Sequence, residues 1–112
     1  MHQDSRGRRG HKDLQVCRQV FDALTYALAE IDDPLIDELS LASVMPAPSA
    51  ARVEVTLVPS RYDFDIDEAL ARLAAVIDDL REEVAAEITR RRVPELAFRI
   101  THLDPRSDVR DR

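Results

Sequence analysis

The sequence has few cysteine, glycine and aromatic residues, and each shortage excludes a class of site. Cys17 is the only cysteine, so the chain cannot form an internal disulfide, and we expect a reducing compartment. Both glycines, Gly7 and Gly10, stand in the first ten residues, so the body of the chain has no Gly-rich phosphate loop. Because tryptophan is absent and aromatics make up 4%, Tyr26 and Tyr62 give little support to single-strand recognition by base stacking.

Long apolar runs are also missing. No stretch is long enough to span a bilayer, and the first 13 residues have no apolar signal-peptide core. We therefore expect a cytoplasmic protein with no membrane partner. Hydrophobic residues still make up 45% of the 112, which is enough for a core, and this length suits one domain.

Charge is distributed unevenly along the chain, whose formal net charge is −6. Residues 1–12 carry four cations against one acid, whereas residues 13–101 carry nine arginines against 18 acidic side chains. An acidic body does not attract a polyanion over long range, so any nucleic-acid contact has to come from local clusters. We predict a flexible basic arm over 1–12, a folded domain over 13–101 and a flexible tail over 102–112.

Apolar spacing predicts two helical regions. The first covers residues 13–31 and ends at the sequence DDP, because a residue before proline is displaced from helical geometry. Its apolar stripe consists of Leu14, Cys17, Val20, Phe21, Leu24, Leu28 and Ile31. The second covers residues 65–88 and begins with Asp65 and Glu68 as a capping box. Its stripe keeps one phase, which leaves open one long helix or two helices at a shallow angle: Ile66, Leu70, Leu73, Ile77, Leu80, Val84 and Ile88.

Alternating apolar residues predict three strands, over 38–45, 51–58 and 95–100. In the first, we expect Leu39, Leu41 and Ser43 on one face and Ser40, Ala42 and Val44 on the other. In the other two, the apolar faces are Val53, Val55 and Leu57, and Leu96, Phe98 and Ile100. The order predicts an α+β domain in which a hairpin and a third strand form a sheet with helices packed on one face.

Three stretches, LAEIDDPLI, SVMPAPSAARVEVTLV and RRRVPELAFR, resemble the ribosome-binding factor A family over residues 13–101. The resemblance implies a type II K-homology-like fold, α-β-β-α-α-β, and a monomeric, non-enzymatic factor without cofactors. It implies action in ribosome biogenesis, namely maturation of the small (30S) subunit and 16S rRNA processing, through RNA binding on the immature subunit. It also places the family's interhelical kink at Val76, Ile77 and Asp78, where this sequence lacks the family's alanine and glycine.

Arg90, Arg91 and Arg92 are the leading candidates for RNA binding. Cations at a helix C-terminus are stabilised by the helix dipole by about 0.3–1 kcal/mol each. Successive helical residues point roughly 100° apart, so capping explains one of these arginines better than it explains three. Arg81, about three helical turns before Arg92, either extends the same patch or pairs with Asp78.

The N-terminal arm supplies four further candidates, which are either a solvated tail or a means of reaching a polyanion: Arg6, Arg8, Arg9 and Lys12. No metal site is predicted. The acidic run over 63–68 lacks the glycine and the distal glutamate of a calcium loop, and helix capping explains it. His2, His11 and His102 have no partner at ligand spacing. No catalytic motif is present, so we expect no enzymatic activity.

A protein-interaction module is the alternative. The stripe over 66–88 has nearly the four-three rhythm of a coiled-coil seam, so a single straight helix could dimerise through it. Against this, the apolar faces of the strands need the same stripe as a cover.

Overall fold

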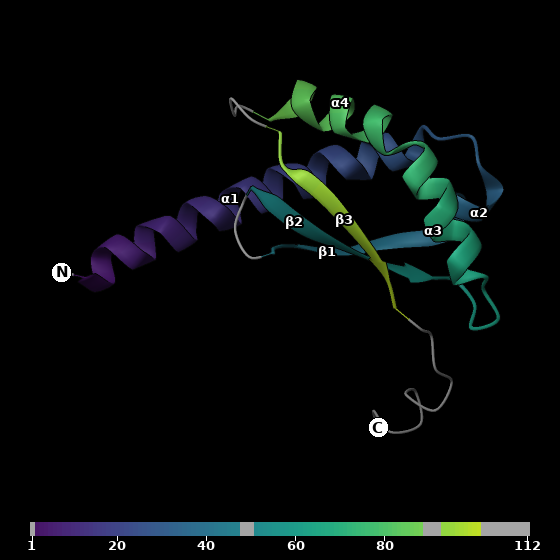
Figure 1. Ribbon diagram of the computed structural model, residues 1–112, viewed down its shortest axis with the longest axis horizontal. Coiled ribbons are helices and arrows are strands. Elements are labelled where there is room, and N and C mark those ends of the chain that lie inside the picture. Colours follow the sequence, from purple (N-terminus) through teal and green to yellow (C-terminus); the bar gives the residue numbers. More distant parts are fainter. Residues whose placement is uncertain (1, 48–50, 89–92, 102–112) are drawn as a thin grey trace.

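The computed structural model describes residues 2–47, 51–88 and 93–101, with side chains from Leu14 onward. Its elements are α1 (His2–Ala29), α2 (Pro34–Asp37), β1 (Leu39–Pro46), β2 (Arg52–Pro59), α3 (Ile66–Ala75), α4 (Ile77–Glu87) and β3 (Glu95–Ile100). The predicted α+β order is confirmed, with the four-residue helix α2 as an addition. Figure 1 shows a sheet with the helices gathered on one side of it.

The central strand of the sheet is β2, which pairs antiparallel with β1 and parallel with β3. Val53, Val55 and Leu57 are completely buried, whereas Glu54 and Thr56 on the opposite face are half-buried. This is the alternation that the sequence predicts for a strand with one covered face. Each of these three buried residues lies opposite an apolar residue of β3, in the pairs Val53–Leu96, Val55–Phe98 and Leu57–Ile100.

A β-bulge at Ala42 changes the predicted faces of β1. Leu41 lies opposite Leu57, but the next paired residue is Ser43, opposite Thr56, so Ala42 has no partner in β2. The extra residue shifts the alternation by one position. Val44 therefore lies opposite Val55 on the buried face, and the prediction that Ser43 shared the face of Leu39 and Leu41 is wrong.

Helix α1 begins at His2, so residue 13, the predicted start of the domain, is not a boundary of this helix. The stripe of α1 also differs from the prediction at its first residue, because the side chain of Leu14 is 55% exposed. The buried side of α1 instead gains Val16, Ala23 and Ala27 beside the predicted core residues. Cys17 is buried in this core, as expected for a small apolar side chain.

The second helical region consists of two helices that run in clearly different directions (Figure 1). Of the predicted alternatives, two helices are confirmed and one long helix is wrong, and the two helices do not meet at the shallow angle that was expected. Leu73 of α3 and Leu80 and Val84 of α4 are buried against the sheet and α1. Because the stripe is part of the core, it is not available to a coiled-coil partner.

Candidate nucleic-acid interface

The three predicted RNA-binding arginines, Arg90, Arg91 and Arg92, lie outside the described residues. Helix α4 ends at Glu87, with Ile88 as its C-cap, and has no basic residue in its last turn. The last turn of α4 therefore contains none of the three arginines, and their predicted role at the helix end stays a prediction. They follow it in sequence, in a short connection between two buried residues, Ile88 and Pro94.

The N-terminal candidates Arg6, Arg8, Arg9 and Lys12 fall within the backbone of α1, but their side chains lie outside the described set. The structure does show where this part of the helix points. One cavity of about 280 Å³ is lined by Ala27 and Ile31 of the α1 end and by Asp79 and Leu80 of the α4 start. The N-terminal half of α1 therefore extends toward the opposite end of α4, the end that leads to β3 (Figure 1).

Arg81 is engaged inside the domain. Its Nη2 donates a hydrogen bond to the carbonyl oxygen of Val93 at 3.2 Å, in a part-buried setting. Its Nε is buried and has no hydrogen-bond partner among the described residues. Within the described part of the chain, Arg81 forms no ion pair with Asp78. The predicted surface ion pair with Asp78 is therefore wrong, whereas a patch shared with Arg92 stays a prediction, because Arg92 lies outside the described residues.

At the predicted kink, the chain leaves helical geometry at Val76, which ends α3 and precedes α4 with φ −110° and ψ 12°. Val76 makes no side-chain cap, and Ile77 starts α4. Asp78 and Asp79 lie in the first turn of α4, where the helix dipole stabilises negative charge. Because two carboxylates already occupy this helix end, it is a poor site for a phosphate.

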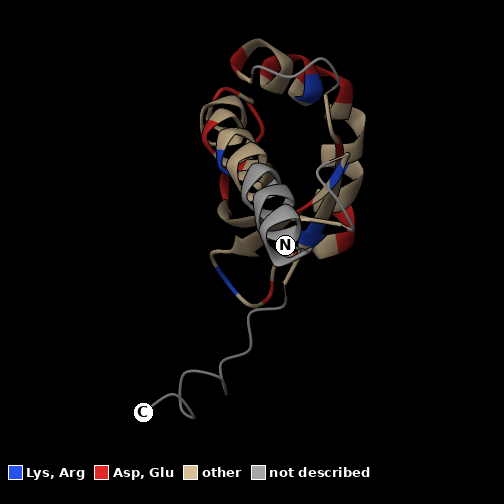
Figure 2. Cartoon of the chain, turned by 90° about the vertical axis from the view of Figure 1, so that its left-hand side faces the viewer, with Lys and Arg blue, Asp and Glu red and all other residues tan. Residues whose placement is uncertain are grey.

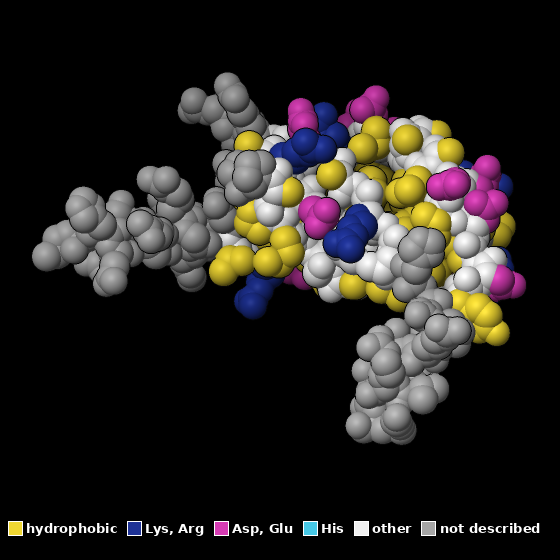
Figure 3. Space-filling view, turned by 60° about the horizontal axis from the view of Figure 1, so that its bottom comes forward, with side chains coloured by type: hydrophobic (Ala, Val, Ile, Leu, Met, Phe, Trp, Pro, Cys, Tyr) yellow, Lys and Arg dark blue, Asp and Glu magenta, His cyan; other side chains and the backbone are white. Residues whose placement is uncertain are grey.

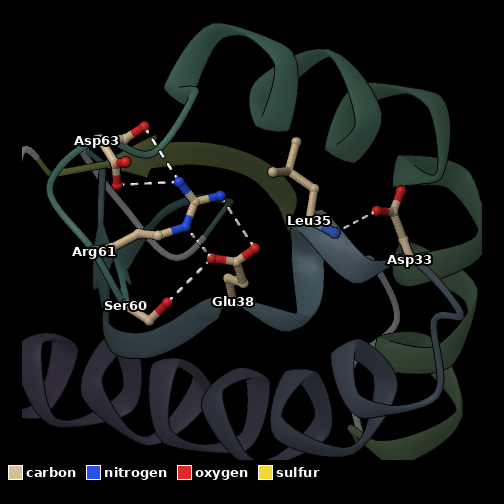
Figure 4. A network of polar contacts seen from close by, with 6 residues as sticks. All are labelled: Asp33, Leu35, Glu38, Ser60, Arg61 and Asp63. Atoms are coloured by element: carbon tan, nitrogen blue, oxygen red, sulfur yellow. Dashed lines mark hydrogen bonds and ion pairs between the residues drawn. The ribbon is translucent and has the colours of Figure 1, made fainter.

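A polar network that the sequence did not predict surrounds Arg61 (Figure 4). Its Nε and Nη2 donate to the two carboxylate oxygens of Glu38, at 2.6 and 3.3 Å. Its Nη1 donates to the carboxylate of Asp63 at 3.1 Å, and its guanidinium carbon lies 5.7 Å from the centre of the Phe64 ring. The bonds from Arg61 lower the pKa of Glu38 and exceed the opposing effect of desolvation.

A second network connects α2 with α3. The carboxylate of Asp33 caps α2 by accepting from the backbone N–H of Leu35 at 2.9 Å, and it also accepts from Nη1 of Arg72 at 2.9 Å. Arg72 donates through its Nε to Glu68 at 3.0 Å. Desolvation raises the pKa of Asp33, but the bonds from Arg72 and the backbone outweigh it, so this pKa lies below its ordinary value.

Acidic side chains of residues 63–68 bind partners within the fold. Asp65 caps α3 through a hydrogen bond from the backbone N–H of Glu68 at 3.1 Å, as the sequence predicts. Asp63 binds Arg61, and Glu68 binds Arg72. Within the part of the chain that the structure describes, no group of three or more His, Cys, Asp or Glu residues could hold a metal ion.

These networks leave three exposed arginines without a polar partner among the described residues, and they are Arg18, Arg52 and Arg99. Figure 2 shows more acidic than basic positions along the helices and their connections. On the face seen in Figure 3, basic side chains are isolated among apolar and acidic ones. The described surface therefore has no continuous basic patch there.

Comparison with solved structures adds the decisive observation. The crystal structure of ribosome-binding factor A from Thermus thermophilus superposes with a TM-score of 0.68 at 22% identity, covering 79% of this chain and 94% of that one. The chain has the fold of ribosome-binding factor A. A solution structure from Thermotoga maritima, provisionally assigned as a ribosome-binding factor A, gives a TM-score of 0.60 at 14% identity, covering 82% and 85% of the two chains.

The similarity to ribosome-binding factor A comes from the comparison of structures, and comparisons of sequence do not add to it. No protein-family model matches the sequence, and no curated protein matches it at a significant level. The predicted K-homology-like architecture of three strands with helices on one face is thus confirmed by the structural neighbour. None of the helices in the described ranges is both long and apolar enough to cross a membrane.

Proposed function

We propose that this protein is a ribosome-binding factor without enzymatic activity. It acts in maturation of the small (30S) subunit and in 16S rRNA processing by binding rRNA on the immature subunit. The observation that carries the proposal is the match with the Thermus protein, because it covers 94% of that chain and so includes nearly its whole domain.

The arrangement of the described charges supports a contact made by local basic segments. Arg61 and Arg72 are neutralised by carboxylates, and the described body is acidic. The two sequence segments rich in cations are residues 1–12 and 90–92. The first belongs to the N-terminal half of α1, and the second follows α4, whose end lies toward the same side of the molecule (Figure 1).

A two-segment contact of this kind suits a structured RNA on a subunit surface. Phosphate contacts by arginine supply affinity that decreases with salt, while the acidic remainder of the surface limits non-specific binding. Recognition of this kind relies on the shape of the RNA backbone, because Tyr26 and Tyr62 are exposed but far apart in sequence and no tryptophan is present.

The test is sedimentation of a lysate that contains the tagged full-length protein, at low and moderate salt. We expect the protein in fractions that contain free small subunits and their precursors, with a higher occupancy on the immature form. Washing the subunits with increasing salt releases it gradually, with a slope that reports a few neutralised phosphates. Sedimentation at the top of the gradient at every salt concentration would contradict the proposal.

A further inference from the structure

The contacts of Arg81 give this residue a role different from the one that its charge suggests. The side chain leaves α4 and reaches Val93, twelve residues later, where Nη2 binds the backbone carbonyl. Because Nε is buried, the guanidinium is packed inside the domain along part of its length. An arginine held in this way cannot turn outward to a phosphate without breaking its bond and exposing the packed atoms.

The residue that Arg81 binds begins the last described segment of the domain. Val93 is followed by Pro94, which is completely buried, and by Glu95, whose backbone N–H donates to the carbonyl of Ala51 at 3.0 Å. Val93, just before β3, is thus attached to α4 through Arg81, and Glu95, the first residue of β3, is attached to Ala51, which directly precedes β2. Before the connection, Ile88 is buried and its N–H donates to the carbonyl of Val84.

We propose that Arg81 is a positioning residue for RNA binding, which acts by holding α4 to the start of β3 and makes no contact with phosphate. This inference rests on the proposed function. We call the hydrogen bond from Arg81 to Val93 the tether. It fixes the position of Val93 and Pro94, the junction that follows Arg92 in sequence and leads into β3. Binding groups on a fixed junction lose less conformational freedom on association, so the tether raises affinity without adding a charge contact.

The experiment compares the full-length protein with Arg81→Met and Arg81→Lys. Arg99→Met is the matched control, because Arg99 is an exposed arginine without a polar partner among the described residues, on the last strand. Circular dichroism verifies the fold of each variant. Amide hydrogen exchange at Glu95 and Leu96 reports the junction, and binding to purified small ribosomal subunits is measured over a range of KCl concentrations.

For Arg81→Met we expect faster exchange at Glu95 and affinity reduced roughly two- to tenfold at every salt concentration, the effect of one lost hydrogen bond. The slope of log K against log salt stays unchanged. Arg81→Lys, which keeps the charge and a donor but not the planar fork, shows a smaller loss of affinity. If Arg81 contacts phosphate, the slope instead decreases in magnitude by about 0.7–0.9 in Arg81→Met.

That change of slope overturns the inference, as does unchanged affinity in a variant whose junction exchanges faster. Arg99→Met shows whether loss of any one arginine has the same effect, and an equal loss of affinity in it also overturns the inference. Failure of the wild-type protein to bind small subunits contradicts the proposed function itself. In that case a role of Arg81 in RNA binding is contradicted too, whereas the exchange data still report the tether.

Discussion

The guanidinium of Arg61 and the carboxylate of Glu38 meet through two parallel hydrogen bonds, Nε to Oε1 at 2.6 Å and Nη2 to Oε2 at 3.3 Å. Glu38 is the residue between α2 and β1, and Arg61 lies in the connection from β2 to α3, directly after Ser60. Ser60 adds a backbone bond, because its N–H donates to the carbonyl of Glu38 at 2.9 Å. The pair therefore fixes the entrance of β1 against the exit of β2.

Replacing Arg61 with lysine should lower the thermal unfolding temperature, although the charge is kept. An ammonium group cannot reproduce the paired bonds to Glu38 together with the bond to Asp63. Differential scanning calorimetry measures the change. Arg99→Lys is the control and should leave the midpoint unchanged, since Arg99 is exposed and has no polar partner among the described residues. Equal midpoints for Arg61→Lys and wild type would contradict a stabilising role for the network.

The free energy of unfolding should decrease in acid because Asp33 and Glu38 have lowered pKa values in the folded protein. Their ordinary values are 3.8 and 4.5. A group with a lowered folded pKa contributes stability above its unfolded pKa and loses it as the pH falls through the folded one. The contribution is therefore complete above about pH 5 and decreases below it. Urea titrations of wild type and Glu38→Gln between neutral and acid pH measure it, and the variant should have the smaller pH dependence.

The bulge at Ala42 predicts opposite outcomes for two neighbouring residues of β1. Val44→Ala should reduce the free energy of unfolding by about 1–3 kcal/mol, because Val44 is 6% exposed and packs on the core. Ser43→Val should change it by no more than about 0.5 kcal/mol, because Ser43 is half-buried on the face away from the core, opposite Thr56. Chemical denaturation measures both. The reverse order of effects would indicate the regular alternation without the bulge.

Changing Arg90, Arg91 and Arg92 together to Glu should abolish association with small subunits and preserve the fold, since α4 ends before them. Co-sedimentation and circular dichroism measure these two properties. The matched control is Arg18→Glu, Arg52→Glu and Arg99→Glu, which changes net charge equally at exposed arginines without polar partners among the described residues. We expect the control to retain binding. Equal loss in both variants would indicate a general effect of charge, and binding by the first would remove this cluster from the mechanism.

The elements that could be predicted from sequence are those whose signals are local. The alternation of Val53, Val55 and Leu57 and the cap formed by Asp65 each depend on residues within one strand or one helical turn. Apolar spacing does not predict helix α2, because the sequence DDP also indicates the end of α1. Asp33 as N-cap followed by Pro34 in the first turn is a recognisable start signal, and it could have identified α2.

The remaining features depend on pairing between distant segments. The bulge at Ala42 is fixed by which residues of β2 lie opposite β1, and no pattern within β1 reveals that register. Arg61, Arg72 and Arg81 find their distant partners through the tertiary fold, and no pattern in the neighbouring sequence identifies them. Arg81 is the only arginine among the predicted site residues whose side chain the structure describes. Its observed partner is the backbone of Val93, which the sequence did not predict.

The parallel pairing of β2 with β3 also determines the order in which the chain can fold. β1 and β2 are close in sequence and can pair early. β3 is separated from β2 by α3 and α4, so it can pair with β2 only after these two helices have formed. We expect closure of this last strand to limit the folding rate, since it brings together the most distant partners of the sheet. Pulse-labelling during refolding would then show protection of β3 amides last, so a nascent chain completes this sheet only after residues 95–100 have been synthesised.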